Sequence, residues 1–157
     1  MSIRVLFVCH GNICRSPMAE FVFKDMVKKK GLAGSFFIAS AATSTEELGN
    51  PVHVGTRAVL GRLGISTEGK YAVQIKREDY RNYDYIIGMD SANIRNMNRI
   101  FGDDKDNKIW KMLEFAGMSR DVDDPWYTGK FEKTYEDILA GCKGLLEYIM
   151  NHDKDRL

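Results

Sequence analysis

A short apolar segment near the start of the chain, Ile3 to Val8, runs directly into a loop that begins at Cys9. Its residues are nearly all apolar, without the alternation of a half-exposed strand, so the segment predicts a β-strand that is buried on both faces. Strands of this kind belong to parallel sheets that helices cover on both sides. The segment therefore limits the chain to an α/β fold.

Alternating strands and helices are also predicted for the rest of the chain. Ser16 and Pro17 look like a helix cap followed by proline at the first helical position. No linker, repeat or low-complexity segment interrupts the 157 residues, so we expect a single domain over residues 1–157, with helices on both faces of a parallel sheet. Further strands are predicted at Phe36–Ala42, Tyr83–Met89 and Lys108–Leu113, and further helices at Val54–Leu63, Ser91–Phe101 and along the apolar stripe from Tyr135 to Ile149.

Charge and cysteine content exclude several classes of protein. The 23 Lys and Arg residues nearly cancel the 22 Asp and Glu residues, so the basic excess of nucleic-acid-binding proteins is missing and no nucleic-acid partner is expected. The apolar runs are too short for a signal peptide or a membrane span. The three cysteines form no paired framework of the kind found in secreted domains. We expect a cytoplasmic protein with free thiols and no membrane partner.

The loop after the first strand has the features of an anion site. Five residues separate Cys9 from Arg15, which lets the chain curl around a centre and lead into a helix N-terminus. Backbone N–H groups of such a loop point inward and bind anions. Gly11 and Asn12 tolerate backbone angles that are closed to most residues, so both help the loop to curl.

Three side chains of this loop predict chemistry on a phosphate group. The inward N–H groups favour the thiolate form of Cys9, which is the nucleophilic form. Arg15 offers a planar fork that binds two phosphate oxygens. The hydroxyl of Ser16 is placed to donate a hydrogen bond to the thiolate. A cysteine at a strand end is usually core and an arginine at a helix start is usually surface, but their combination at this spacing favours nucleophilic catalysis.

The segment from Val8 to Pro17 resembles the signature of the low-molecular-weight protein tyrosine phosphatases. The resemblance implies a four-stranded parallel sheet, no metal or cofactor, and hydrolysis of phosphotyrosine-containing proteins or small aryl phosphates through a phosphocysteine on Cys9. It implies that Ser40 supports the loop and that the substrate contacts His10, Gly11, Asn12, Ile13, Cys14, Ser16, Trp126 and Tyr127. The similarity continues at Ser40–Ser44, Gly49–Pro51, Asp79–Asp90 and Asp124–Tyr127.

Expulsion of a phenolate requires a proton donor, and two adjacent acids are candidates. Asp124 precedes Pro125, which biases it toward extended backbone, and Trp126 and Tyr127 are placed to flank an aromatic substrate. The resemblance implies that the aspartate before this proline is the acid, so we expect Asp124 to protonate the leaving group and then to activate water. Asp123 either raises the proton affinity of Asp124 or is a solvated loop carboxylate.

The remaining cysteines and histidines have simpler roles than Cys9, or roles that the sequence leaves open. Cys14 either protects Cys9 through a transient disulfide, as the resemblance implies, or packs the loop, and Cys142 belongs to the apolar stripe of the last helix. His10, at the rim of the pocket, and the other two histidines lack metal-ligand spacing. The chain departs from the pattern of this family at two places. The histidine that members often carry near residues 69–72 is absent, and Glu46 stands where members often have an aromatic residue. The carboxylate of Glu46 would favour basic over acidic peptides.

Other functions fit the sequence less well. Thioredoxin-coupled arsenate reductases have a similar fold, but they need two further redox cysteines near the middle of the chain, where this sequence has none. A related branch hydrolyses phosphoarginine and tends to carry threonine where this chain has Ile13, and we keep it as the second interpretation. A phosphate-binding module would need neither a thiolate nor an acid, and the glycine pattern of dinucleotide sites is missing. We expect a monomer.

Overall fold

The first strand, β1 (Ile3–Cys9), lies inside a four-stranded parallel sheet of order β2-β1-β3-β4. The computed structural model describes residues 2–157. The neighbours of β1 are β2 (Phe36–Ala42) and β3 (Tyr85–Gly88), and β4 (Ile109–Lys111) lies at the edge beyond β3. In the register, Val5 of β1 pairs with Ile38 on one side and Tyr85 on the other. The predicted fold class, an α/β fold with a four-stranded parallel sheet, is confirmed.

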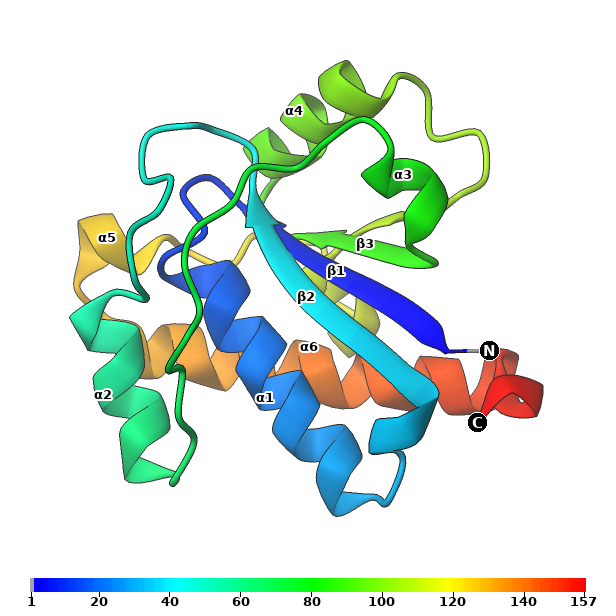
Figure 1. The fold of residues 1–157 in the computed structure, drawn as a ribbon, viewed down its shortest axis with the longest axis horizontal. Helices are drawn as coiled ribbons and strands as arrows, with labels where there is room; N and C mark the ends of the chain where they lie inside the picture. The colour runs from blue at the N-terminus through cyan, green and yellow to red at the C-terminus, as the bar shows by residue number, and fades with distance from the viewer. Residues whose placement is uncertain (1) are drawn as a thin grey trace.

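Helices cover both faces of the sheet, as Figure 1 shows. α1 (Arg15–Lys29) and α6 (Phe131–His152) lie on one face, where Val5 and Phe7 of β1 join their core. α3 (Asp79–Asn82) and α4 (Ser91–Phe101) lie on the other face, over Leu6 and Val8. The remaining elements are α2 (Val54–Arg62), α5 (Pro125–Thr128) and the 3-10 turns η1 (Ala33–Ser35), η2 (Met112–Ala116) and η3 (Lys154–Arg156).

Most predicted elements have the expected bounds, and the differences have local causes. The strand predicted at Tyr83–Met89 is shorter at both ends. At the end of α3, which was not predicted, the N–H of Tyr83 donates to the carbonyl oxygen of Asp79, and the N–H of Met89 donates to the side chain of Asn93. The strand predicted at Lys108–Leu113 ends at Lys111 because the chain turns there into η2. The stripe of the last helix is confirmed, and α6 extends beyond it at both ends.

The carboxyl ends of the strands position the candidate site. The loop after β1, the segment after β2 and α5 lie together at this end of the sheet (Figure 1). Ligands of open parallel sheets bind at this edge. None of the helices in residues 2–157 combines the length and the apolarity that a membrane crossing requires.

Close packing of η2 against α6 depends on glycine. A Cβ atom added at Gly144 of α6 would overlap the backbone carbonyl oxygen of Phe115 in η2. Because the obstacle is backbone rather than a flexible side chain, the two segments must move apart to accept it.

We therefore expect Gly144→Ala to lower the free energy of unfolding by about 3 kcal/mol, the upper end for overpacking. Gly61→Ala in α2 is the matched control, because nothing lies within 4 Å of the added methyl group. It should be neutral or slightly stabilising, since alanine favours helix. Urea denaturation measures both variants, and equal stabilities would contradict this account of the packing.

Candidate active site

The sulfur of Cys9 lies at the end of β1 and accepts hydrogen bonds from the loop that follows. The backbone N–H groups of Asn12 and Ser16 lie 3.3 Å and 3.4 Å from Cys9 Sγ, and the Ser16 hydroxyl oxygen lies 3.0 Å from it. Donors that converge on one sulfur stabilise a thiolate there. The loop therefore forms the cradle that the sequence predicts.

The start of the following helix differs from the prediction. α1 begins at Arg15, with Cys14 at the N-cap position and no side-chain cap, so Ser16 lies within the first turn and does not cap the helix. The N–H groups of a first helical turn have no partner within the helix. Here the N–H of Ser16 is used by Cys9, and Pro17 has no N–H to satisfy.

Asn12 holds the curl of the loop. It adopts a left-handed backbone conformation with φ of 59° and is buried, as the sequence indicates for asparagine. Gly11 differs from the prediction, because its φ is not positive. The side chain of Glu47 instead approaches Gly11 so closely that an added Cβ would lie 3.3 Å from Glu47 Cγ.

Hydrogen bonds from Asn12 determine where the neighbouring protons point. Its side-chain oxygen accepts from the N–H of Val73 at 3.1 Å, so its amide nitrogen is the donor to Ser16 Oγ at 2.8 Å and to Ser40 Oγ at 2.9 Å. Ser40 in turn donates to Glu20 at 2.6 Å. The oxygen of Ser16 thus accepts from Asn12, and when Cys9 is a thiolate, which can only accept, the Ser16 hydroxyl is the donor to it.

Lys70 lies in the region, residues 69–72, where the resemblance noted in the sequence leads one to expect a histidine. Its ammonium donates to the carbonyl oxygen of Ser40 at 2.8 Å and lies 3.8 Å from the buried Glu20 carboxylate. Burial lowers the pKa of Lys70, and the attraction of Glu20 opposes that effect. Glu20 and Lys70 were not predicted as site residues, and together they support Ser40 from behind the loop.

Arg15 is buried beneath the loop and bound by carboxylates. Its guanidinium donates to Asp90 at 2.7 Å and to the carbonyl oxygen of Val122 at 2.9 Å, and it lies 3.5 Å from Asp124. Burial alone would lower the pKa of Arg15, but the Cys9 sulfur and the carboxylates of Asp90 and Asp124 raise it above its ordinary value. The side chain is therefore a fixed cation.

Asp124 is brought to the loop by α5. It is the N-cap of that helix, where its carboxylate accepts from the N–H of Trp126 at 3.0 Å, and Pro125 occupies the first helical position. Its side chain is 26% exposed. The adjacent Asp123 is exposed.

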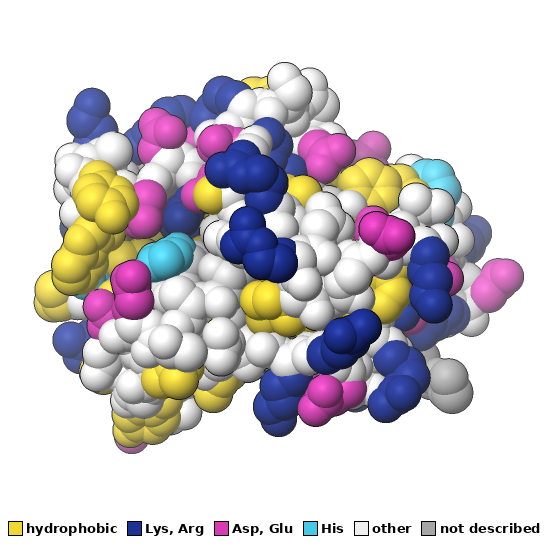
Figure 2. Space-filling model, turned by 90° about the horizontal axis from the view of Figure 1, so that it is seen from above, with side chains coloured by type: hydrophobic (Ala, Val, Ile, Leu, Met, Phe, Trp, Pro, Cys, Tyr) yellow, Lys and Arg dark blue, Asp and Glu magenta, His cyan; other side chains and the backbone are white. Residues whose placement is uncertain are grey.

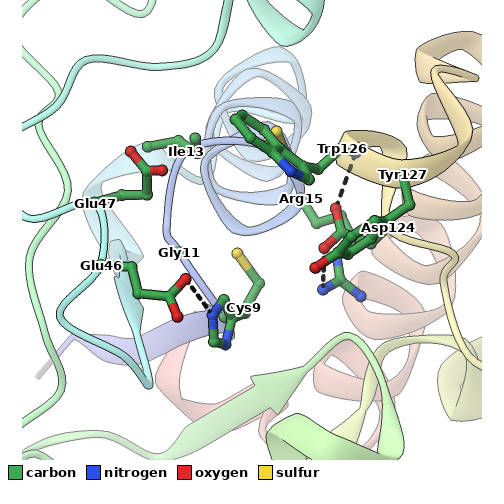
Figure 3. Close-up of a pocket in the computed structure, with 11 residues that line it drawn as sticks. Cys9, Gly11, Ile13, Arg15, Glu46, Glu47, Asp124, Trp126 and Tyr127 are labelled. Atoms are coloured by element: carbon green, nitrogen blue, oxygen red, sulfur yellow. Dashed lines mark hydrogen bonds and ion pairs between the residues drawn. The ribbon is translucent and has the colours of Figure 1, made fainter.

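One pocket contains most of the predicted site residues. Figure 3 shows Cys9 at its centre, Glu46 and Glu47 on one side and Asp124, Trp126 and Tyr127 on the other. The predicted residues Asn12, Ser16 and Ser40 do not line the pocket but form the hydrogen-bond network behind it. The lining residues are Cys9, His10, Gly11, Ile13, Cys14, Arg15, Glu46, Glu47, Asp124, Trp126 and Tyr127.

His53, whose part in the site was not predicted, braces the pocket wall. Its backbone N–H donates to the carbonyl oxygen of Ile13 at 2.8 Å, and its ring stacks on Phe131 with centroids 5.0 Å apart. The same ring makes an edge-to-face contact with Trp126, with centroids 5.7 Å apart. His53 therefore connects the loop to α5 and α6.

The other two cysteines are protonated thiols. Burial is the main cause that raises the pKa of Cys14 to about 12, and burial also raises the pKa of Cys142. Cys142 packs in the core, as the apolar stripe predicts. Across residues 2–157, no cluster of three or more His, Cys, Asp or Glu side chains is arranged to hold a metal ion.

The segment that carries Val122 and Asp124 is anchored on α6. Arg120 donates two hydrogen bonds to the buried Asp137, at 2.8 Å and 3.0 Å, and Lys133 donates a third at 3.1 Å. The hydrogen bond from Arg120 is the first cause that lowers the pKa of Asp137 below its ordinary value of 3.8.

Asp137→Asn should therefore lower the free energy of unfolding at pH 7, by about 1–3 kcal/mol. The pKa of this carboxyl is lower in the folded state, so its stabilisation is present above its ordinary pKa and is lost as the pH falls through the folded value. The difference between wild type and variant should shrink below pH 4 in urea denaturation. A difference that is constant with pH would contradict the ion-pair account.

Lys70→Gln should slow alkylation of Cys9 by iodoacetamide at pH 6 by roughly 3- to 10-fold, because it removes a partly buried cation whose charge attracts the Cys9 sulfur, an interaction of about 1 kcal/mol. Lys24→Gln is the matched control, because Lys24 binds the other oxygen of Glu20 from a more exposed position. Mass spectrometry identifies the alkylated residue. Equal rates for Lys70→Gln and Lys24→Gln would contradict a role for Lys70 behind the loop.

Comparison with known proteins gives consistent matches. The family described as "Low molecular weight phosphotyrosine protein phosphatase" matches residues 4–155. YfkJ of Bacillus subtilis, named a low molecular weight protein-tyrosine-phosphatase, is 45% identical over 149 residues, 94% of this chain and 96% of the relative. Its crystal structure superposes with a TM-score of 0.92 over 96% of each chain.

Two further solved structures share the fold. The low molecular weight protein tyrosine phosphatase SP-PTP of Streptococcus pyogenes is 42% identical, with a TM-score of 0.85 over 97% of this chain and 96% of that one. DARP, a Drosophila arginine phosphatase, is 28% identical, with a TM-score of 0.84 over 93% of this chain and 97% of that one.

Proposed function

The chain belongs to the low molecular weight phosphotyrosine protein phosphatase family, and from this premise we propose that it hydrolyses phosphotyrosine through a phosphocysteine on Cys9. It is an enzyme of the protein-tyrosine-phosphatase class. The observation that carries the mechanism is the set of groups around Cys9 Sγ: two backbone N–H donors and the Ser16 hydroxyl, 3.0 Å away, which can donate to a thiolate.

In the first step, the Cys9 thiolate attacks phosphorus and the bond to the tyrosine oxygen breaks. Arg15 and the loop N–H groups bind the oxygens of the transferring phosphoryl group, which carry the developing charge. Asp124 donates its proton to the departing phenolate, so tyrosine leaves as the neutral phenol. The products are tyrosine, phosphorylated Cys9 and ionised Asp124.

In the second step, water attacks the phosphocysteine. Asp124 accepts a proton from the water, the new P–O bond forms and the S–P bond breaks. Cys9 leaves as a thiolate, which Ser16 and the N–H donors stabilise. Release of inorganic phosphate returns the enzyme to its starting protonation state.

Apolar side chains at the pocket wall support phosphotyrosine as the substrate. Ile13 lines one part of the pocket, and Trp126 and Tyr127 are 56% and 84% exposed at another. Phenyl rings pack well against such surfaces. We place this activity in a reducing compartment such as the cytoplasm, because Cys9 acts as a free thiol and all three cysteines of the chain are free.

Phosphoarginine is the second candidate substrate. The observation that favours it is the similarity to the Drosophila arginine phosphatase. The presence of Ile13 argues against phosphoarginine, because an apolar side chain at that position packs better against a phenyl ring than against a guanidinium group. A phosphate-binding module without catalysis is a weaker candidate, since binding needs neither Cys9 as a thiolate nor Asp124 as an acid.

Hydrolysis of para-nitrophenyl phosphate and of matched phosphotyrosine, phosphoserine and phosphoarginine peptides tests the proposal. Cys9→Ser should be inactive, and Asp124→Asn should lower kcat by about 10²- to 10⁴-fold, the range for loss of acid–base catalysis. Asp123→Asn is the matched control and should change kcat far less, because the Asp123 side chain is exposed.

The preferred peptide separates the candidates. Preference for phosphotyrosine supports the proposal, and preference for phosphoarginine replaces it with the second candidate. A wild-type protein that binds phosphate but hydrolyses none of the substrates would show that the loop is a binding module.

A further inference from the structure

Two carboxylates form one wall at the mouth of the pocket. Glu46 and Glu47 follow β2, and Figure 3 places them across the pocket from Trp126 and Tyr127. The side chain of Glu46 is 68% exposed, and its carboxylate lies 2.9 Å from the ring nitrogen of His10, which is 48% exposed. The charge of Glu46 is therefore open to any peptide that enters the pocket.

The segment with these carboxylates is tied to the phosphate loop. The N–H and hydroxyl of Ser44 both donate to the carbonyl oxygen of His10, at 3.1 Å and 2.8 Å. Asn50 donates to the Glu47 carboxylate at 2.6 Å. A phosphate held on Cys9 therefore meets the two carboxylates at a fixed position.

Charge in the pocket changes sign with depth. Among the described residues that line the pocket, Arg15 is the only lysine or arginine. Its side chain is buried and donates a hydrogen bond to Asp90. Among the acidic lining residues, Asp124 lies 3.5 Å from Arg15, whereas Glu46 and Glu47 belong to the more exposed segment after β2. Figure 2 shows acidic side chains beside exposed hydrophobic ones and a histidine at this end of the molecule, on the left. A phosphate is attracted to the base, whereas an acidic neighbour of that phosphate meets like charge.

We infer that Glu46 and Glu47, which form the rim of the pocket, select phosphotyrosine sites flanked by lysine or arginine. Glu46 is the main specificity-determining residue. The inference rests on the proposed function and names its substrate class. A guanidinium or ammonium group beside the phosphotyrosine replaces His10 as the partner of Glu46 and forms a charge-assisted hydrogen bond. Because the pair is exposed, the preference is a few-fold and is screened by salt.

The test compares two phosphotyrosine peptides that differ only at the residues next to the phosphotyrosine, arginine on both sides in one and glutamate on both sides in the other. The readout is the ratio of their kcat/KM values. Wild type should prefer the arginine peptide. Glu46→Gln should lower the ratio by about 2- to 5-fold, Glu46→Lys should lower it further, and 0.5 M NaCl should bring all ratios closer together.

Glu147→Gln on α6 is the matched control, because it removes an exposed carboxylate that does not line the pocket. Its ratio should equal that of wild type. Equal ratios for wild type, Glu46→Gln and Glu46→Lys would overturn the inference and leave the proposed function standing. Failure of wild type to hydrolyse either peptide would instead overturn the proposed function.

Discussion

The sulfur of Cys9 makes three hydrogen bonds at the end of a buried strand, and the positions of the surrounding residues follow from that arrangement. Two of the donors are backbone N–H groups, which requires the loop to curl back on itself, and the left-handed Asn12 makes that curl possible. The third partner is the Ser16 hydroxyl, whose oxygen is held in place by a hydrogen bond from Asn12.

Arg15 connects the loop to segments from the second half of the chain. A buried guanidinium must be paired, and its partners Asp90 and Val122 come from the ends of β3 and of the segment before α5. Asp90 also caps α4, so the position of that helix and the orientation of Arg15 are coupled. In the proposed mechanism, the same cation lies near the acid, Asp124, and the phosphate.

The fold and the centre of the site were readable from the sequence because both depend on local patterns. The apolar run before Cys9, the spacing to Arg15 and the Asp124-Pro125 pair are each contained in a few neighbouring residues. The support from Glu20 and Lys70 was not readable, because the two residues are distant in sequence and meet only after β2 and the segment before α3 are in place. The start of α1 was also missed, because the cradle uses N–H groups that a side-chain cap would otherwise satisfy.

The rim and the base of the pocket therefore have different proposed functions. Glu46 at the rim selects the substrate, and Cys9 at the base carries out the reaction. The proposed mechanism depends most on a covalent bond between Cys9 and phosphate. Rapid quenching of wild type during its first turnover of an aryl phosphate, followed by mass spectrometry, tests that bond directly. The account predicts a phosphoryl group on the peptide that contains Cys9, and hydrolysis without a phosphorylated cysteine at any time point would contradict it.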